Sequence, residues 1–270
     1  MAIPDPSKDS VAIVTGASAG IGADIARSLA QRGRNVLLVA RREERLTALA
    51  EELASAHGVR AETVAADLQA KAGRKRLLTA VDELGLRVDV LVNNAGFGTA
   101  GRFQSLDPGR EAELVRLNCE VVVELCGRFL PGMVQRGGGA VLNVASTAAF
   151  QPLPTQATYS ASKAFVLAFT QAIAADLHGT GVTATALCPG PVKTEFAAVS
   201  GLERDAAVLP EFVWVPSPDV AEAGVDGMER GKGVVIPGKL NRLTSIGGQY
   251  TPRSVLLGLG RRVYRLGGAR

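Results

Sequence analysis

The chain has 270 residues, of which 47% are hydrophobic and 21% are charged. That length suits one large α/β domain, and the composition excludes a disordered or collagen-like chain. The net charge of +4 is unevenly spread, because residues 231–270 hold eight Lys and Arg and no Asp or Glu, which leaves −4 for residues 1–230. The chain is therefore a mildly acidic body with a basic C-terminal tail, and we expect no nucleic-acid partner.

Cysteine and histidine are scarce. Cys119, Cys126 and Cys188 form neither a disulfide framework nor a C-x-x-C metal pattern, and with only His57 and His178 besides, we expect no metal site. The N-terminal segment lacks the apolar region of a signal peptide, and no run approaches the ~20 apolar residues of a membrane span. These features predict a cytoplasmic protein with reduced thiols.

Short β-branched, apolar runs alternate along the chain with longer amphipathic stretches. The predicted strands are Val11–Thr15, Asn35–Ala40, Ala61–Ala65, Val88–Asn93, Ala140–Ala145, Val182–Cys188 and Val234–Ile236. The predicted helices are Ile21–Arg32, Glu43–His57, Lys71–Leu84, Arg110–Leu130, Ala157–His178 and Asp219–Glu229. Most strands are apolar throughout, as expected when both faces of a parallel sheet are covered. The alternation predicts a doubly wound α/β sheet in a single domain over residues 1–270.

The first predicted strand leads directly into the segment T-G-A-S-A-G-I-G at residues 15–22, which opens a helix. Glycines let the backbone turn tightly and approach a diphosphate, and the helix N-terminus offers it free N–H groups. We predict cofactor contacts from Gly16, Ser18, Ala19, Gly20, Ile21 and Gly22. The T-G-x-x-x-G-x-G spacing differs from G-x-G-x-x-G and resembles the short-chain dehydrogenase/reductase family.

That resemblance continues over residues 10–195 in the family's order. N-N-A-G at 93–96 follows the fourth strand, Asn118 lies in the next helix and Ser146 ends the fifth strand. Tyr159 and Lys163 form a Y-x-x-x-K element, and P-G-P-V-K-T at 189–194 follows the sixth strand. The resemblance to the classical branch implies a Rossmann-type parallel seven-stranded sheet flanked by helices. It also implies further cofactor contacts, from Asp67, Leu68, Asn94, Ala95, Gly96, Tyr159, Lys163, Pro189, Gly190, Val192 and Thr194.

Tyr159 and Lys163 lie four positions apart, so on a helix they share one face. A tyrosine with an ordinary pKa near ~10 is a poor base at neutral pH. A neighbouring ammonium and an oxidised nicotinamide ring would lower that pKa towards the range that proton transfer needs. Ser146 offers a hydroxyl to the substrate oxygen. The resemblance implies that Asn118 holds a water linking the lysine to solvent. We predict that Asn118, Ser146, Tyr159 and Lys163 are catalytic.

The end of the second strand indicates which nicotinamide cofactor is used. NAD sites place an Asp or Glu there to bind the ribose 2′-hydroxyl, whereas an arginine accommodates a 2′-phosphate. This chain has Arg41 and Arg42 there and no acid. A guanidinium can bind phosphate through two hydrogen bonds. The pattern favours NADP(H), and the alternative is that both arginines are solvated residues at the start of a charged helix.

Two segments depart from the α/β pattern. Residues 195–218 are long for a connection, which favours a substrate lid over a surface loop, and Phe196, Phe212 and Trp214 predict an apolar pocket. Residues 240–270 mix apolar and basic side chains with several glycines. This C-terminal tail could lie on an anionic membrane surface as a peripheral contact, pack at a subunit interface or line the substrate entrance.

The preferred hypothesis is an NADP(H)-dependent oxidoreductase that transfers a hydride between the cofactor and a small, apolar carbonyl or alcohol, with Tyr159 as its acid/base. The alternatives are a non-catalytic NADP-binding protein on the same fold and an epimerase or dehydratase. The family resemblance implies a homodimer or homotetramer that pairs the helices at Arg110–Leu130 and Ala157–His178.

Overall fold

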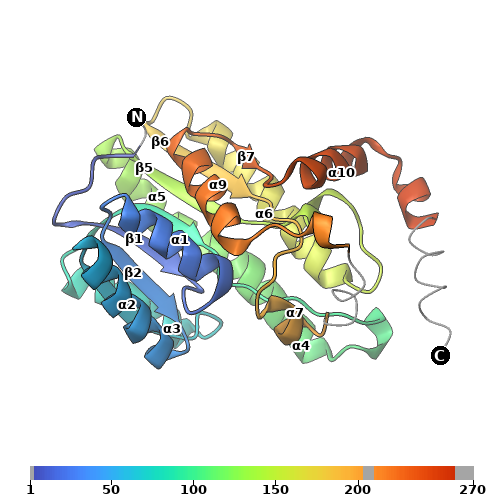
Figure 1. Cartoon of the computed structure of the whole chain (residues 1–270), viewed down its shortest axis with the longest axis horizontal. Helices are drawn as coiled ribbons and strands as arrows, with labels where there is room; N and C mark the ends of the chain where they lie inside the picture. The colour runs from blue at the N-terminus through green and yellow to red at the C-terminus, as the bar shows by residue number, and fades with distance from the viewer. Residues whose placement is uncertain (1–2, 203–209, 259–270) are drawn as a thin grey trace.

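The computed structural model describes residues 3–202 and 210–258, and a parallel sheet flanked by helices forms its centre (Figure 1). The strands are β1 (Ser10–Thr15), β2 (Val36–Ala40), β3 (Ala61–Ala65), β4 (Arg87–Asn93), β5 (Gly139–Val144), β6 (Val182–Leu187) and β7 (Val234–Val235). They are ordered β3-β2-β1-β4-β5-β6-β7. The predicted seven-stranded Rossmann-type sheet is therefore confirmed.

Helices connect these strands. The α-helices with both ends in the described residues are α1 (Gly20–Gln31), α2 (Glu43–His57), α3 (Lys71–Glu83), α4 (Pro108–Val115), α5 (Val121–Arg136), α6 (Ala157–Asp176), α7 (Phe196–Ser200), α9 (Ser217–Glu229) and α10 (Lys239–Tyr250), and residues 253–258 are also helical. One π-helical turn, η2 (Arg116–Glu120), joins α4 to α5. Within the described ranges, three short 3₁₀ helices are η1 (Phe103–Ser105), η3 (Thr147–Phe150) and η4 (Glu211–Val213).

The two faces of the sheet are covered by different helices. Helices α1, α2 and α9 pack on one face, where Val14 of β1 belongs to the core cluster. Helices α3, α5 and α6 pack on the other, where the neighbouring Ile13 belongs to a second cluster. Successive strand side chains point to opposite faces, so a strand covered on both sides must be apolar at every position. This explains the unbroken apolar runs in the sequence.

The chain changes direction between β1 and β4. It starts at β1, runs outwards through β2 to β3 and then crosses back to β4, so β1 pairs with both β2 and β4. The connections on either side of this point lead away from each other and leave a crevice at the carboxyl ends of the strands. The glycine segment after β1 and the N-N-A-G segment after β4 meet there.

Two helices differ from the sequence expectation. The helix predicted at Arg110–Leu130 starts at Pro108, runs on to Arg136 and contains the π-helical turn at Asn118. The start of the C-terminal tail folds as α10, whereas the glycines that weaken a helix prediction, from Gly258 on, lie beyond it. A Cβ on Gly248 would lie 3.1 Å from the side-chain oxygen of Gln151, so α10 packs closely on the body there. The rest of the tail, 259–270, lies outside the described residues.

Candidate active site

A cavity of about 830 Å³ opens at the carboxyl ends of the strands. The predicted site residues line it, except for Gly22 and Asn118, which do not reach its surface. Nineteen of the predicted positions thus converge on one crevice although they are spread from Gly16 to Thr194. The topological switch point is what brings them together.

The glycine loop after β1 is packed against the segment after β4. The Asn94 side chain donates hydrogen bonds to the carbonyl oxygens of Thr15 (2.9 Å) and Gly16 (3.3 Å). A Cβ on Gly16 would lie 2.7 Å from Asn94 Nδ2, and φ of +67° there also disfavours a side chain. A Cβ on Gly22 would overlap the Gly16 carbonyl oxygen. The turn can therefore stay this tight only with glycine at both positions.

Thr15 fastens this loop to the sheet. Its hydroxyl donates to the Val92 carbonyl oxygen at 3.1 Å and accepts from the backbone N–H groups of Asn94 and Ala95 at 3.0 Å each. The carboxyl ends of β1 and β4 are thereby held at a fixed separation. The glycine loop and the N-terminus of α1 thus form a cradle, and free N–H groups at such a position can bind an anionic group.

The two arginines after β2 have different surroundings. Arg42 donates to Ser18 Oγ (3.2 and 3.1 Å) in the glycine loop and pairs with Glu195 at 2.7 Å. Arg45 pairs with the same carboxylate at 2.6 Å. Arg41 also lines the cavity and has no ion pair with another described residue. Both predicted arginines are thus at the site, and Arg41 is the more available of the two.

Helix α6 supplies the two buried polar side chains at the inner end of the cavity. Tyr159 and Lys163 are 8% and 6% exposed, and Lys163 Nζ lies 5.8 Å from the centre of the Tyr159 ring. Lys163 Nζ donates to the Val144 carbonyl oxygen at 2.8 Å. Ser146 follows β5, and its hydroxyl accepts from the N–H of Ala148 at 3.1 Å as the cap of η3. The three predicted catalytic side chains that face the cavity therefore converge from β5 and α6.

Burial dominates the titration of this pair. It raises the pKa of the Tyr159 phenol to about 12, and the Ser146 hydroxyl offsets part of the rise. Burial likewise lowers the pKa of the Lys163 ammonium to about 8. The sequence expectation of a lowered tyrosine pKa is therefore wrong for the protein alone. The ammonium is directed at Val144, and loss of water around the phenol outweighs its influence.

Asn118 lies behind the cavity in the π-helical turn, where it is 1% exposed. Its side chain accepts from the N–H of Phe97 at 3.2 Å and donates to the Phe97 carbonyl oxygen at 3.0 Å. It also lies 3.0 Å from Ser162 Oγ on α6. Asn118 thus joins the segment after β4 to α6, and π turns of this kind occur frequently at functional sites.

The outer part of the cavity is apolar. Tyr159 and Phe196 rings lie with their centres 5.5 Å apart, and Trp214 also lines the wall. Phe212, predicted to belong to the pocket, is 74% exposed instead, because the short η4 turn directs it outwards. The sequence reasoning missed Phe97, which directly follows N-N-A-G, and also Thr244 and Ser245 of α10. Position after the motif was a usable signal for Phe97, whereas Thr244 and Ser245 lie in the C-terminal tail, for which lining the substrate entrance was one of three alternatives.

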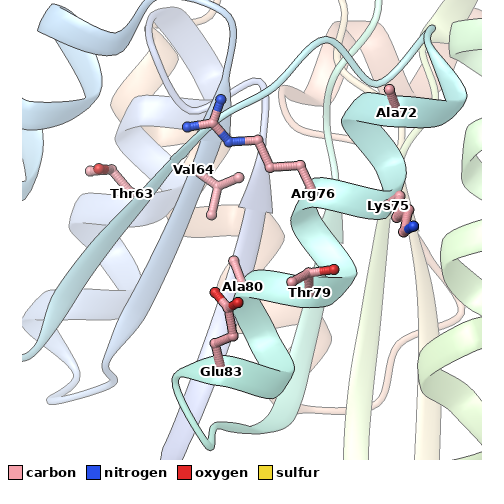
Figure 2. A pocket seen from close by; sticks show the side chains of 8 residues that line it. All are labelled: Thr63, Val64, Ala72, Lys75, Arg76, Thr79, Ala80 and Glu83. Carbon is pink, nitrogen blue, oxygen red and sulfur yellow. The ribbon is translucent and has the colours of Figure 1, made fainter.

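A second hollow lies away from this cavity. Figure 2 shows it beside the edge strand β3, where side chains of α3 such as Arg76 and Glu83 surround about 490 Å³. No predicted site residue lines it. The described residues also contain no group of three or more His, Cys, Asp or Glu side chains placed to hold a metal ion. The crevice at the strand ends is therefore the candidate active site.

A family model described as short chain dehydrogenase matches residues 10–205. The chain belongs to the short-chain dehydrogenase family. This assignment confirms the resemblance seen in the sequence motifs and agrees with the sheet order and with the placement of the Y-x-x-x-K element on α6.

Curated relatives cover most of this short-chain dehydrogenase. Sulfoacetaldehyde reductase 2 of Chromohalobacter salexigens is 38% identical over 217 residues, which are 78% of this chain and 85% of the relative. The NADP-dependent 3-hydroxy acid dehydrogenase of Salmonella typhi is 36% identical over 223 residues, 79% of this chain and 86% of the relative. The family and these relatives show that the dehydrogenase is an oxidoreductase of alcohol and carbonyl groups.

A solved structure of similar fold also carries a cofactor. The short-chain dehydrogenase from Sphingobium yanoikuyae in complex with NADPH has a TM-score of 0.80 and 32% sequence identity, covering 92% of this chain and 95% of that chain. The match extends over nearly the whole of the dehydrogenase described here.

Proposed function

We propose that this dehydrogenase interconverts a carbonyl and an alcohol with NADP(H), and that Tyr159 is its acid/base. The observation that carries the proposal is the convergence of Ser146, Tyr159 and Lys163 at the inner end of a crevice whose other end is the glycine cradle. These three side chains can donate hydrogen bonds to a carbonyl oxygen, and the cradle can hold the diphosphate of a dinucleotide. The arrangement therefore suits hydride transfer between a dinucleotide and a bound carbonyl.

The residues present fit a nicotinamide dinucleotide. The cradle formed by Gly16 and Gly22, which a Cβ would fill, would hold the diphosphate at the N-terminus of α1. Asp67 and Leu68 would hold the adenine, and Lys163 would hold the nicotinamide ribose. The bound cofactor supplies the hydride. The remaining contacts proposed are Ser18, Ala19, Gly20, Ile21, Arg42, Asn94, Ala95, Gly96, Tyr159, Pro189, Gly190, Val192 and Thr194.

NADP(H) rather than NAD(H) is supported by the charge at the end of β2. Arg41 and Arg42 line the cavity and no acid follows the strand directly, so a 2′-phosphate would meet positive charge. Arg41 would take the phosphate, because it has no competing ion pair among the described residues. Arg42 would contribute from its position between Ser18 and Glu195. The NADPH complex of the similar solved structure agrees with this choice.

The raised pKa of Tyr159 suits the reducing direction. A phenol with a pKa of about 12 is protonated at neutral pH and can give its proton to the substrate oxygen as negative charge develops there. Ser146 would donate a second hydrogen bond to the same oxygen. In the oxidising direction Tyr159 must first lose its proton, and the charges of Lys163 and of an oxidised nicotinamide would then favour the phenolate.

Asn118 would act as a positioning residue. It hydrogen-bonds to both backbone groups of Phe97 and to Ser162 Oγ on α6, and so holds the segment after β4 against the helix that carries Tyr159 and Lys163. The sequence resemblance adds a water held near the lysine, which would return protons to Tyr159. Both roles require the π-helical turn that directs Asn118 inwards.

The apolar outer wall supports a substrate with an apolar body. Phe196 and Trp214 flank the route to Tyr159, and both lie in the segment 195–218 expected to act as a lid. Residues 203–209 of that segment lie outside the described part. Two relatives are named for small polar compounds, sulfoacetaldehyde and 3-hydroxy acids, so the apolar body is proposed from the cavity wall alone.

We also propose a homodimer or homotetramer through α5 and α6. Val123 on α5 and Phe165 on α6 are 42% and 43% exposed, which leaves apolar surface on both helices. Phe165 stacks on Phe169 with ring centres 5.9 Å apart and so presents a flat aromatic face. Light scattering on the purified protein tests this directly, since a monomer at all concentrations contradicts it.

The function is tested by following NADPH oxidation with a panel of aldehydes, aliphatic and aromatic ketones, and 3-oxo acids. Product analysis must show alcohol and NADP⁺ accumulating in equal amounts. Turnover of substrate without net NADPH consumption would instead support epimerisation or dehydration. NADPH binding without any turnover across the panel would support a non-catalytic binding protein.

A further inference from the structure

Helix α10 presents an apolar stripe to solvent. Its buried side is formed by Asn241, Ser245 and Gly248. On the opposite side Leu243, Ile246 and Tyr250 are 68%, 40% and 80% exposed. These positions recur at i, i+3 and i+7 and therefore form one continuous face. A surface helix of a globular protein normally has polar residues on its solvent-exposed face and apolar residues on its buried face. Helix α10 has the opposite distribution.

Exposed apolar residues next to this stripe enlarge the apolar surface. The Asn241 side chain donates to the carbonyl oxygen of Val213 at 3.4 Å, which places η4 beside the start of α10. Phe212 of that turn and Leu240 at the start of α10 are 74% and 39% exposed. Val255, beyond the end of α10, is 49% exposed. Half of the exposed large apolar residues among the described positions thus lie between 212 and 255.

The charge of α10 and of the residues after it is of one sign, whereas the adjoining η4 turn carries exposed Glu211, which pairs with Lys193 at 2.8 Å. Exposed Lys239 and Arg242 flank the stripe, and Arg253 follows it. From residue 231 to the end of the sequence there are eight Lys and Arg and no Asp or Glu. Figure 1 shows α10 at the far side of the molecule from α2 and α3. The apolar and basic features therefore coincide at one end of a chain whose remainder is mildly acidic.

We infer that α10 and residues 251–258 after it bind an anionic lipid surface, with Leu243, Ile246 and Tyr250 inserted at the interface. An amphipathic helix with apolar residues flanked by Lys and Arg binds anionic bilayers through both buried apolar area and charge attraction. No helix in the described ranges is long and apolar enough to cross a membrane, so the contact is peripheral.

A second copy of the chain fits this surface less well. A two-fold contact through α10 would bring the same basic patch from each copy together. Lys239 and Arg242 would then face like charges, and the region after residue 230 offers no acid to pair with them. An anionic headgroup layer meets the same residues with opposite charge.

The contact would place the cavity next to the lipid. Thr244 and Ser245 line the active-site cavity, while Leu243 and Ile246 on the same helix face outwards. A lipid-bound molecule thus holds the cavity wall against the bilayer, where apolar carbonyl compounds partition. The lipid contact itself needs neither cofactor nor substrate, so its test is independent of the proposed reaction.

The experiment is sedimentation of the full chain with phosphatidylcholine vesicles made with and without phosphatidylglycerol. We expect binding to the anionic vesicles at low salt, weaker binding at about 0.5 M salt, and little binding to pure phosphatidylcholine. The triple variant Leu243→Gln, Ile246→Gln, Tyr250→Gln should lower the partition coefficient by about tenfold or more. Lys239→Gln with Arg242→Gln should lower it by about tenfold.

Two control variants test whether the loss of vesicle binding is specific to α10. Phe103→Gln with Val134→Gln removes exposed apolar residues elsewhere, and Lys75→Gln with Arg76→Gln removes exposed charges from α3. Both controls should bind vesicles as the parent does. The melting temperature should be the same in all variants, which shows that they fold without relying on the proposed cofactor.

Several outcomes would overturn the inference. These are no binding at low salt, equal binding to neutral and anionic vesicles, or unchanged binding of the stripe variant. One further result would assign the surface to a contact between copies of the chain. In that case the parent binds no vesicles, and the triple variant of Leu243, Ile246 and Tyr250 loses the oligomers that light scattering detects for the parent.

Discussion

Lys163 Nζ lies 2.8 Å from the carbonyl oxygen of Val144, so the last residue of β5 directly holds the lysine of α6. The bond holds an ammonium in a site where burial lowers its pKa to about 8. Burying the charged Lys163 ammonium lowers the free energy of unfolding. A residue that destabilises the fold in this way is a candidate for a functional role.

The first prediction concerns this cost. Because the folded-state pKa of Lys163 lies below the ordinary value of 10.5, the folded protein binds fewer protons than the unfolded chain between those values. The penalty is full below about pH 8 and vanishes as pH approaches 10.5. Lys163→Met should therefore raise the free energy of unfolding at neutral pH by about 1–2 kcal/mol after loss of the hydrogen bond to Val144.

Urea denaturation from neutral pH to pH 10.5 measures this. The stability gain of Lys163→Met should shrink as pH rises, while its NADPH affinity and turnover fall at every pH. Lys75→Met, on the exposed side of α3, is the control and should change neither stability nor turnover. A destabilised Lys163→Met variant whose deficit does not depend on pH would contradict the account of Lys163.

The second prediction concerns cofactor choice. The parent should bind NADPH more tightly than NADH, because Arg41 lines the cavity, has no ion pair with another described residue and would be available to a 2′-phosphate. Arg41→Ala should weaken NADPH binding by about tenfold to a hundredfold, the loss expected for a charge-assisted hydrogen bond to phosphate. Arg41→Asp should erase or reverse the preference. Fluorescence titration with both cofactors gives the dissociation constants.

Arg45→Ala is the matched control, because Arg45 pairs with Glu195 and does not line the cavity. Its NADPH affinity should stay within about twofold of the parent, as expected for an exposed ion pair. Equal NADPH and NADH affinities in the parent would refute the assignment.

The third prediction uses the glycine cradle. Gly22→Ala would place a methyl group against the Gly16 carbonyl oxygen, closer than van der Waals contact allows, so the loop must open. We expect a loss of about 1–3 kcal/mol in stability and severe loss of cofactor binding. Gly247→Ala in α10 has no atom within 4 Å of its new Cβ and should gain about 0.5–1 kcal/mol. Calorimetry with cofactor titration compares them, and similar behaviour of the two variants would disprove the packing argument.

Local motifs predicted much of this molecule. The glycine loop, the strand ends and the Tyr159–Lys163 spacing each depend on a few adjacent residues, so the amino-acid sequence alone is enough to place them. The π-helical turn could not be predicted in this way, because it depends on hydrogen bonds between Asn118 and Phe97, which are 21 residues apart.

Other features could not be predicted from the sequence because they depend on packing between distant parts of the chain. Helix α10 forms although it contains Gly247 and Gly248, because Gly248 packs on Gln151 and Asn241 packs against Gly190. The sequence could not show whether Phe212 and Trp214 face the cavity or solvent. A short 3₁₀ turn has too few residues for a repeating pattern that separates a buried face from an exposed one. The pKa of Tyr159 depends on its burial, which spacing alone does not predict.

The claim that Tyr159 moves the proton is tested most directly by Tyr159→Phe, which keeps the ring and removes the hydroxyl. The measurement is single-turnover NADPH oxidation on a ketone found in the substrate screen, together with the pH profile of alcohol oxidation. We predict nearly unchanged NADPH affinity, a rate lower by about 10²-fold or more, and loss of the parent's rise in oxidation rate with pH. A Tyr159→Phe variant that turns over at the parent rate with the same pH profile would contradict the account.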